Sequence, residues 1–178
     1  DFYLSGGAAC VASGFVSSGK RGRALAFDGV GDHVRIANSN PLDLTGTSLT
    51  LEAWINPRVL ITSEIVAHEE NGGGGSSDKV AFDLVSTGAL QFCVSDGTTW
   101  SCISTPTSLI KVNTWYYAAA VQNGTAKIIY IDGLNQSYVS TATTMASTGR
   151  NWTVGSDTSG ASLNFNGSID EVKVWNRA

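Results

Sequence analysis

The acidic residues of the chain are its first candidates for chemistry, because enzymes that cleave glycosidic bonds place two carboxylates about 5–10 Å apart around one bond. The sequence holds 15 acidic residues. Glu69-Glu70 and Asp170-Glu171 are adjacent pairs, and adjacent residues on a strand point to opposite faces. Acids far apart in the sequence could still converge, but no local pair predicts hydrolysis. The chain also has neither a Gly-x-Ser-x-Gly elbow nor a phosphate-binding loop.

The tryptophans are the second candidates, because the apolar face of a sugar ring stacks on an aromatic ring while polar side chains bond its hydroxyls. Trp100 follows an Asp96-Gly97 turn, and Trp152 follows Arg150 at the start of an expected strand. A rigidly held tryptophan loses little conformational entropy on binding. We therefore predict Trp100 and Trp152 as ligand-binding residues. Asp96 and Arg150 are their expected polar partners, and the alternative for each ring is that it only anchors its own loop.

Two of the three cysteines are placed to form a disulfide. Two strands joined by a reversal at 96–99 would bring Cys93 opposite Cys102, and side chains paired across strands have Cβ atoms about 4.5–5.5 Å apart. We predict this disulfide and, with it, a secreted or cell-surface, extracytoplasmic location. The alternative is two buried free thiols. The third cysteine, Cys10, has no partner that the sequence identifies.

Short strands separated by turns rich in glycine and asparagine account for most of the chain. The segment 48–56 shows the pattern best, because Leu49, Leu51, Ala53 and Ile55 share one face. About a dozen strands without a convincing helix predict one all-β domain over 1–178, either a two-sheet antiparallel sandwich or a barrel. Residues 1–21 are expected to be an irregular N-terminal segment, and 69–77 a surface loop. The other expected strands are 24–27, 33–36, 63–67, 80–85, 89–94, 115–121, 126–131, 151–155 and 169–175.

The composition excludes several other classes of protein. Only 15% of residues are charged, and the chain has 20 glycines and one methionine, which opposes a helical bundle. The 11 lysines and arginines are scattered in a chain of net charge −4, so no basic stripe is present for nucleic acid. The longest apolar runs, such as 115–121, are too short to span a bilayer. We expect neither nucleic-acid binding nor membrane insertion.

Four segments, in this order, carry a resemblance to a known family. They are GRALAFDG at 22–29 with DHV at 32–34, LTLEAWI at 49–55, WYYA at 115–118 leading to IYIDG at 129–133, and FNGSIDEVKVWNRA at 165–178. Together they resemble the laminin-G-like jelly rolls of the concanavalin A-like lectin/glucanase superfamily. The resemblance covers residues 22–178 and lies in the order and spacing of all four segments. It implies a jelly-roll sandwich of two antiparallel sheets.

The resemblance also implies where catalytic and metal-binding residues would lie. Glucanases of this superfamily place their carboxylates at alternate positions of one strand, and no two acids here are separated by two positions. Several members bind calcium, and their early and final strands lie near one another. Asp28 and Asp170 could therefore meet at a structural calcium ion. The alternative is that Asp28 caps its own turn and that Asp170 makes a buried hydrogen bond.

Members of this superfamily commonly serve as carbohydrate-binding modules or as adhesion domains. We therefore predict a non-catalytic carbohydrate-binding module of a larger secreted protein, which holds an appended enzyme or a cell surface near a polysaccharide. The first alternative is an adhesion module that binds a protein partner. The second alternative is a glycan hydrolase or lyase.

Overall fold

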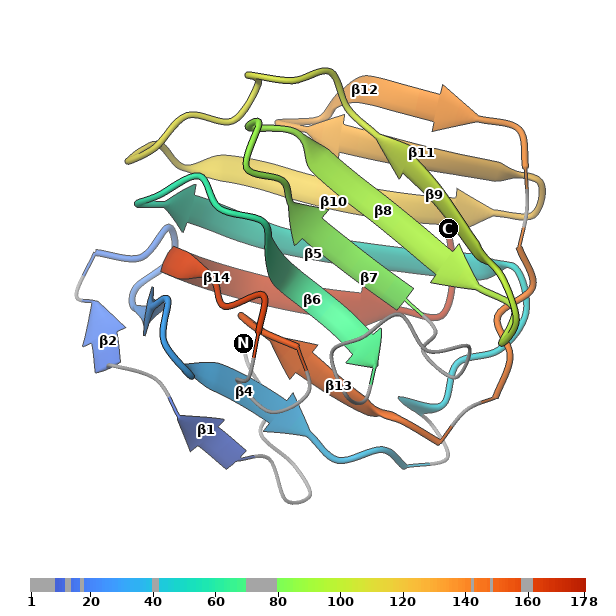
Figure 1. Ribbon diagram of the computed structural model, residues 1–178, viewed down its shortest axis with the longest axis horizontal. Helices are drawn as coiled ribbons and strands as arrows, with labels where there is room; N and C mark the ends of the chain where they lie inside the picture. Colours follow the sequence, from blue (N-terminus) through green and yellow to red (C-terminus); the bar gives the residue numbers. More distant parts are fainter. Residues whose placement is uncertain are drawn as a thin grey trace.

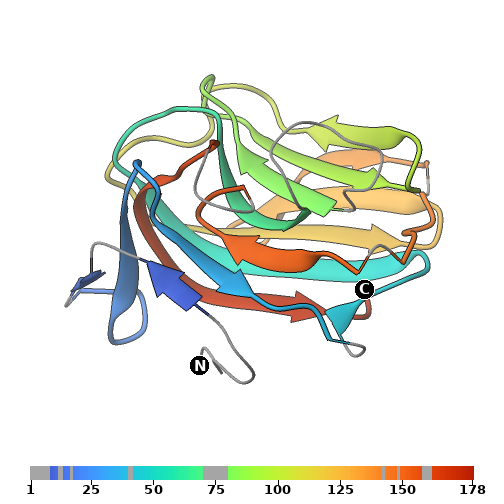
Figure 2. The ribbon, with the colours of Figure 1, turned by 60° about the horizontal axis from the view of Figure 1, so that its bottom comes forward.

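The computed structural model describes residues 9–11, 14–16, 18–39, 42–69, 80–141, 143–147, 149–157 and 162–178. Within these ranges, fourteen β-strands form two antiparallel sheets of seven strands, packed face to face (Figures 1 and 2). No helix in the described ranges is long and apolar enough to cross a membrane. The expected surface loop at 69–77 lies outside the described residues except for its first position.

The sheet that faces the viewer in Figure 1 is here called the front sheet, and the other the back sheet. The front sheet has the order β1 (Ala9–Val11), β4 (His33–Ile36), β13 (Asn151–Val154), β6 (Ser63–Glu69), β7 (Val80–Leu84), β8 (Leu90–Ser95) and β9 (Trp100–Ser104). The back sheet has the order β12 (Leu134–Val139), β11 (Ala126–Ile131), β10 (Tyr116–Asn123), β5 (Ser48–Pro57), β14 (Asn166–Trp175), β3 (Ala24–Asp28) and β2 (Gly14–Val16). The chain crosses repeatedly between the sheets, so the predicted antiparallel jelly-roll sandwich is confirmed.

Alternation of apolar and polar side chains builds the core between the sheets. On β5, the predicted inward residues are all 0% exposed, namely Leu49, Leu51, Ala53 and Ile55. On the front sheet, Phe82 of β7 contacts Phe92 of β8 edge to face, with ring centroids 6.4 Å apart, and both rings are buried. The second face of each of these strands therefore points away from the core and is available for polar residues.

The strands that the sequence did not predict lie at or near sheet edges. The edge strand β12 has exposed or half-buried side chains throughout, so it lacks the apolar alternation on which strand prediction depends. The short strands β1 and β2 fall within the predicted irregular N-terminal segment. The edge strand β12 owes its conformation to backbone pairing with β11 rather than to a buried face. Each of the short strands β1 and β2 is paired with one neighbouring strand.

A buried lysine connects the two sheets at their β9 and β12 edges. Lys127 of β11 is 0% exposed. Its Nζ donates hydrogen bonds to the hydroxyl of Ser101 on β9 (2.7 Å), the hydroxyl of Thr143 (3.1 Å) and the carbonyl of Thr141 (3.2 Å). Burial lowers the pKa of Lys127. The three acceptors compensate the ammonium group for lost water and hold β9 against the back sheet.

We predict that Lys127→Ala lowers the free energy of unfolding by about 3 kcal/mol or more, because it opens a cavity and leaves three acceptors without their donor. Urea unfolding of the purified chain would measure the change. Lys111→Ala is the matched control, since Lys111 is exposed and its loss should alter stability by no more than about 0.5 kcal/mol. Equal unfolding midpoints for the two variants would contradict the stabilising role of Lys127.

Candidate functional site

The hairpin formed by β8 and β9 carries the predicted disulfide. Cys93 and Cys102 occupy directly paired positions and are bonded, with Cα atoms 4.0 Å apart. Phe92 and Val94 on either side of Cys93 lie in the core. The disulfide therefore lies on the outer face of the front sheet, where Cys102 is exposed. The disulfide prediction is confirmed.

Asp96 orders the turn that joins the two strands of this hairpin. Its Oδ1 accepts hydrogen bonds from the Thr98 hydroxyl (2.6 Å) and from the backbone N–H groups of Thr98 (2.8 Å) and Thr99 (2.9 Å). The hydroxyl bond, followed by the two backbone bonds, holds the pKa of Asp96 below its usual value. The side chain is exposed, so a carboxylate that stays ionised stands at the tip of the hairpin.

Trp100 is the first residue of β9 and is half-buried. It pairs with Ser95 and alternates with Ser101, whose hydroxyl faces the core and Lys127. The Trp100 side chain therefore stands on the outer face, on the same side as the disulfide two residues further along. The ordered turn precedes it and the covalent cross-link follows it. This combination leaves a partly exposed indole ring on a backbone with little freedom to move.

Trp152 does not belong to such a site, and its prediction as a ligand-stacking residue is wrong. The residue is 2% exposed, its Nε1 donates a hydrogen bond to the carbonyl of Leu42 (2.9 Å), and its ring contacts His68 edge to face at 4.6 Å. Trp152 belongs to the hydrophobic core between the two sheets. The alternative reading, an anchor for local structure, holds for Trp152.

Arg150 is also separated from the hairpin. It is half-buried and directly precedes β13, which is four positions from β9 in the front sheet. At about 4.8 Å per strand, the separation is about 19 Å. The structure thus brings Trp100 and Asp96 together in one hairpin and leaves Arg150 elsewhere on the sheet.

Asp28 and Asp170 do not come together at a calcium site. Asp28 of β3 pairs with Asn166 of β14, four positions from Asp170, which places the two acids about 13 Å apart along the strands. Oδ1 of Asp28 accepts the N–H of Val30 (2.7 Å), and Oδ2 of Asp170 accepts the N–H of Arg21 (2.9 Å). The alternative reading, structural hydrogen bonds, therefore describes both residues.

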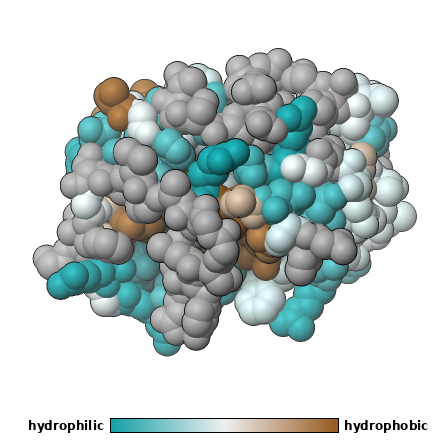
Figure 3. Space-filling model, turned by 90° about the horizontal axis from the view of Figure 1, so that it is seen from below, coloured by the Kyte–Doolittle hydropathy of each residue, from teal (hydrophilic) through white to brown (hydrophobic). Residues whose placement is uncertain are grey.

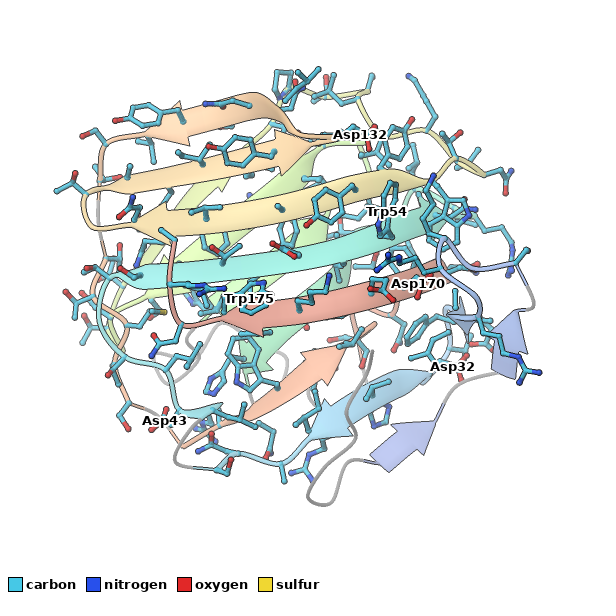
Figure 4. All side chains as sticks on the ribbon, turned by 180° about the vertical axis from the view of Figure 1, so that it is seen from behind. Asp32, Asp43, Trp54, Asp132, Asp170 and Trp175 are labelled. Carbon is cyan, nitrogen blue, oxygen red and sulfur yellow. A yellow bond between two sulfur atoms is a disulfide. The ribbon has the colours of Figure 1, made fainter. Side chains whose placement is uncertain are left out.

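Calcium coordination by this pair does not fit the structure. Figure 4 shows Asp170 on the back sheet beside Trp54, its paired residue on β5. Asp28 lies on the adjacent strand β3, paired with Asn166 and not with Asp170. The described ranges contain no group of three or more His, Cys, Asp or Glu residues placed to hold a metal ion. We derive no chemistry from calcium at Asp28 and Asp170.

A row of polar side chains crosses four strands on the outer face of the front sheet. Glu64 of β6 pairs with Asp83 of β7, Asp83 pairs with Gln91 of β8, and Gln91 pairs with Ser104 of β9. The amide of Gln91 donates a hydrogen bond to the Ser104 hydroxyl (3.1 Å). We call these four residues the polar row. Gln91, the member of the polar row on β8, is four positions from Ser95, which pairs with Trp100. This separation is about 13 Å along the strand.

Asp83 is the unusual member of the polar row. Its Oδ1 is buried and has no hydrogen-bond partner in the part of the chain that the structure describes. Burial raises the pKa of Asp83 to about 7. Glu64 and Asp83 come from neighbouring strands, so the spacing of acids along one strand does not reveal them. The available signal was an acid at the outward position between Phe82 and Leu84.

Exposed apolar side chains are scattered over the described surface. The most exposed are Val30 (78%), Leu134 (67%) and Tyr138 (60%), which lie in a turn and on the edge strand β12. On the described part of the underside, apolar patches are small and separated by polar residues (Figure 3). This pattern is ordinary for a protein surface.

Comparison with known proteins identifies the family and the fold. Residues 28–178 match the family described as the concanavalin A-like lectin/glucanases superfamily. No curated protein matches the chain at a significant level. Among solved structures, the binding domain of Paraclostridial Mosquitocidal Protein 1 is similar at a TM-score of 0.73 and 14% identity, covering 97% of this chain and 44% of that one.

Two further structures share the fold at low sequence identity. Domain 4 of an extracellular arabinanase from Geobacillus stearothermophilus, in complex with arabinotriose, has a TM-score of 0.66 at 17% identity, covering 90% of this chain and 73% of that one. Domains LG4-5 of the mouse laminin alpha1 chain have a TM-score of 0.67 at 17% identity, covering 95% and 44%. The chain spans less than half of the mosquitocidal and laminin chains.

The raised pKa of Asp83 predicts a pH-dependent stability. Between about pH 4 and pH 7 the folded state binds more protons at this carboxyl than the unfolded state does, so the free energy of unfolding falls as pH rises, by up to about 4 kcal/mol. Asp83→Asn should gain stability relative to the parent chain as pH rises through this window, as measured by urea unfolding at several pH values.

Asp96→Asn is the control of opposite sign for this measurement. The lowered pKa of Asp96 means that its ionised form stabilises the fold above the unfolded-state pKa, and that this contribution is lost as pH falls. The parent chain should therefore exceed Asp96→Asn in stability most at neutral pH. Parallel pH profiles for Asp83→Asn and the parent would show that Asp83 titrates normally.

Proposed function

The chain belongs to the concanavalin A-like lectin/glucanase superfamily, and from this membership we propose that it is a non-catalytic carbohydrate-binding module that holds an appended enzyme or a cell surface near a polysaccharide. The observation that carries the proposal is the partly exposed ring of Trp100 on a hairpin fixed by the disulfide and the Asp96 turn. The arabinotriose bound to the structurally similar arabinanase domain supports a glycan as ligand.

The hairpin supplies both kinds of contact that a sugar needs. The indole face of Trp100 offers an apolar platform for the C–H face of a sugar ring. Asp96, at the tip of the same hairpin, offers an ionised carboxylate that accepts hydroxyl hydrogens. Because the turn and disulfide hold the backbone in place, binding costs little conformational entropy. The disulfide also supports an oxidising, extracytoplasmic compartment for the module.

The protein-binding alternative has less support on the described surface. Adhesion through an apolar interface needs a contiguous exposed patch. The most exposed apolar residues, Val30, Leu134 and Tyr138, are instead dispersed between a turn and an edge strand. Trp100 with Asp96 is a small mixed site, which suits a sugar better than a protein surface.

Hydrolysis is the second candidate function, because Glu64 and Asp83 face each other on adjacent strands. Both carboxylates of a glycosidase must reach the scissile bond, and Glu64 is only 1% exposed. We therefore predict that the chain releases no reducing ends from any polysaccharide it binds, as measured by a reducing-sugar assay. Release that is lost in Glu64→Gln would replace the binding proposal with an enzymatic one.

We predict that Trp100→Ala weakens glycan binding at least about tenfold, because it removes the stacking platform. A glycan array would identify the ligands of the parent chain, and calorimetry would then compare the variants. Trp175→Ala is the matched control, since Trp175 is 38% exposed on β14 of the back sheet and should leave affinity unchanged. Equal affinities for Trp100→Ala and the parent would reject this site.

A further inference from the structure

We infer that the ligand site extends from Trp100 across the disulfide to Asp83 and Gln91, so that it takes an internal segment of about three sugar units rather than one terminal sugar. This inference rests on the proposed function and specifies its ligand. It assigns a binding role to Asp83 and Gln91 of the polar row. It also assigns a direction to the bound chain, along β8 and β9.

The register of the front sheet places these residues on its outer face, where Cys102 is exposed and Cys93 and Ser95 are buried. Gln91, Cys93 and Ser95 alternate along β8, and their partners on β9 are Ser104, Cys102 and Trp100. Ser104 and Cys102 are exposed, and Trp100, Gln91 and Asp83 are partly exposed. The strip from Trp100 to Gln91 is about 13 Å long, which exceeds one sugar ring. The disulfide between them presents a small, largely apolar floor.

Asp83 supplies the observation that points to a ligand. A buried carboxylate oxygen without a hydrogen-bond partner is unfavourable, and Oδ1 of Asp83 has none among the described residues. The side chain of Asp83 is partly exposed, so a rotation of its carboxyl group would bring Oδ1 to a bound sugar hydroxyl, which would supply the missing donor. Burial also brings the pKa of Asp83 to about 7, so near neutral pH the group can either accept or donate a hydrogen bond.

Gln91 and Glu64 define the extent of the site on either side of Asp83. The amide of Gln91 is held by its bond to the Ser104 hydroxyl, which presents a planar polar group in a fixed orientation. Glu64 is only 1% exposed, so a ligand cannot contact its carboxyl group directly. A bound chain would therefore pass from Asp83 onto β8 and run along β8 and β9 to Trp100, and it would not extend over β6.

The test is a calorimetric series with cello-, xylo-, arabino- and chito-oligosaccharides of one to six units on the 178-residue chain. We expect affinity to rise up to about three units and then level off. Asp83→Ala and Gln91→Ala should remove this rise, lowering affinity for three or more units at least tenfold and leaving shorter ligands unchanged. Trp100→Ala should lower affinity at every length.

The control variants separate binding from folding. Asn135→Ala, at an exposed position on β12, should bind every ligand as the parent does. Asp83→Asn preserves the side-chain shape, and Gln91→Ala alters a partly exposed residue, so the test stands if Asp83→Ala fails to fold. Near-ultraviolet circular dichroism would verify the fold of each variant.

The outcomes distinguish this inference from the proposed function. Loss of the length dependence in Asp83→Ala or Asp83→Asn and in Gln91→Ala supports the extended site. Equal affinity for one and three units, or unchanged affinity in both Asp83 and Gln91 variants, overturns the extended site while Trp100→Ala can still support glycan binding. Absence of binding by the parent chain, both on the array and in this series, overturns the proposed function and the inference together.

Discussion

The core contact between Phe82 and Phe92 sets the register on which the candidate site depends. The two residues are paired across β7 and β8, and Phe92 is paired with Ile103 on β9. All three side chains are buried in the sandwich. Since side chains alternate along a strand, this row fixes the next positions, those of the polar row, on the outer face. A slip of one residue would bury polar groups and expose phenylalanine, so packing energy enforces the placement of the site.

The position of Trp100 depends on a second constraint, which is the attachment of an edge strand. Edge strands have one neighbour and open easily. Here β9 is held on both faces, by the bond from Cys102 to Cys93 outside and by the bond from Lys127 to the Ser101 hydroxyl inside. Adjacent residues of one strand thus carry the two attachments. Trp100 directly precedes them and inherits their rigidity, although it lies at the margin of the sheet.

The sequence predicted features that depend on local spacing. Alternation identified β5 and its inward face, and the spacing of Cys93 and Cys102 around a turn identified the disulfide. The sequence did not predict features that depend on how the strands are arranged in the sheets. Trp152 resembles Trp100 as a residue at a strand start, but Trp152 lies on the core face of β13, whereas Trp100 lies on the outer face of β9. Alternation indicates that a strand has two faces, and only its neighbours determine which face is solvent-exposed.

The same limit applies to the acidic residues. Asp28 and Asp170 do lie on adjacent strands, as the family resemblance implied, but the register separates them by four positions. The polar row is assembled from four strands, so no search along one strand could find it. The register between strands, which the sequence does not display, therefore determines both the separation of Asp28 from Asp170 and the assembly of the polar row.

The acidic residues differ in whether their carboxyl groups accept hydrogen bonds from the backbone. Asp28, Asp96 and Asp170 each accept a backbone N–H, so each has a structural role in a turn or strand end. Asp83 accepts no such bond among the described residues, and burial disfavours its charge. A buried carboxylate oxygen without a hydrogen-bond partner costs the fold free energy. Residues that destabilise the fold are often retained because they bind a ligand. The unfavourable burial of Asp83 therefore supports its place in the binding surface.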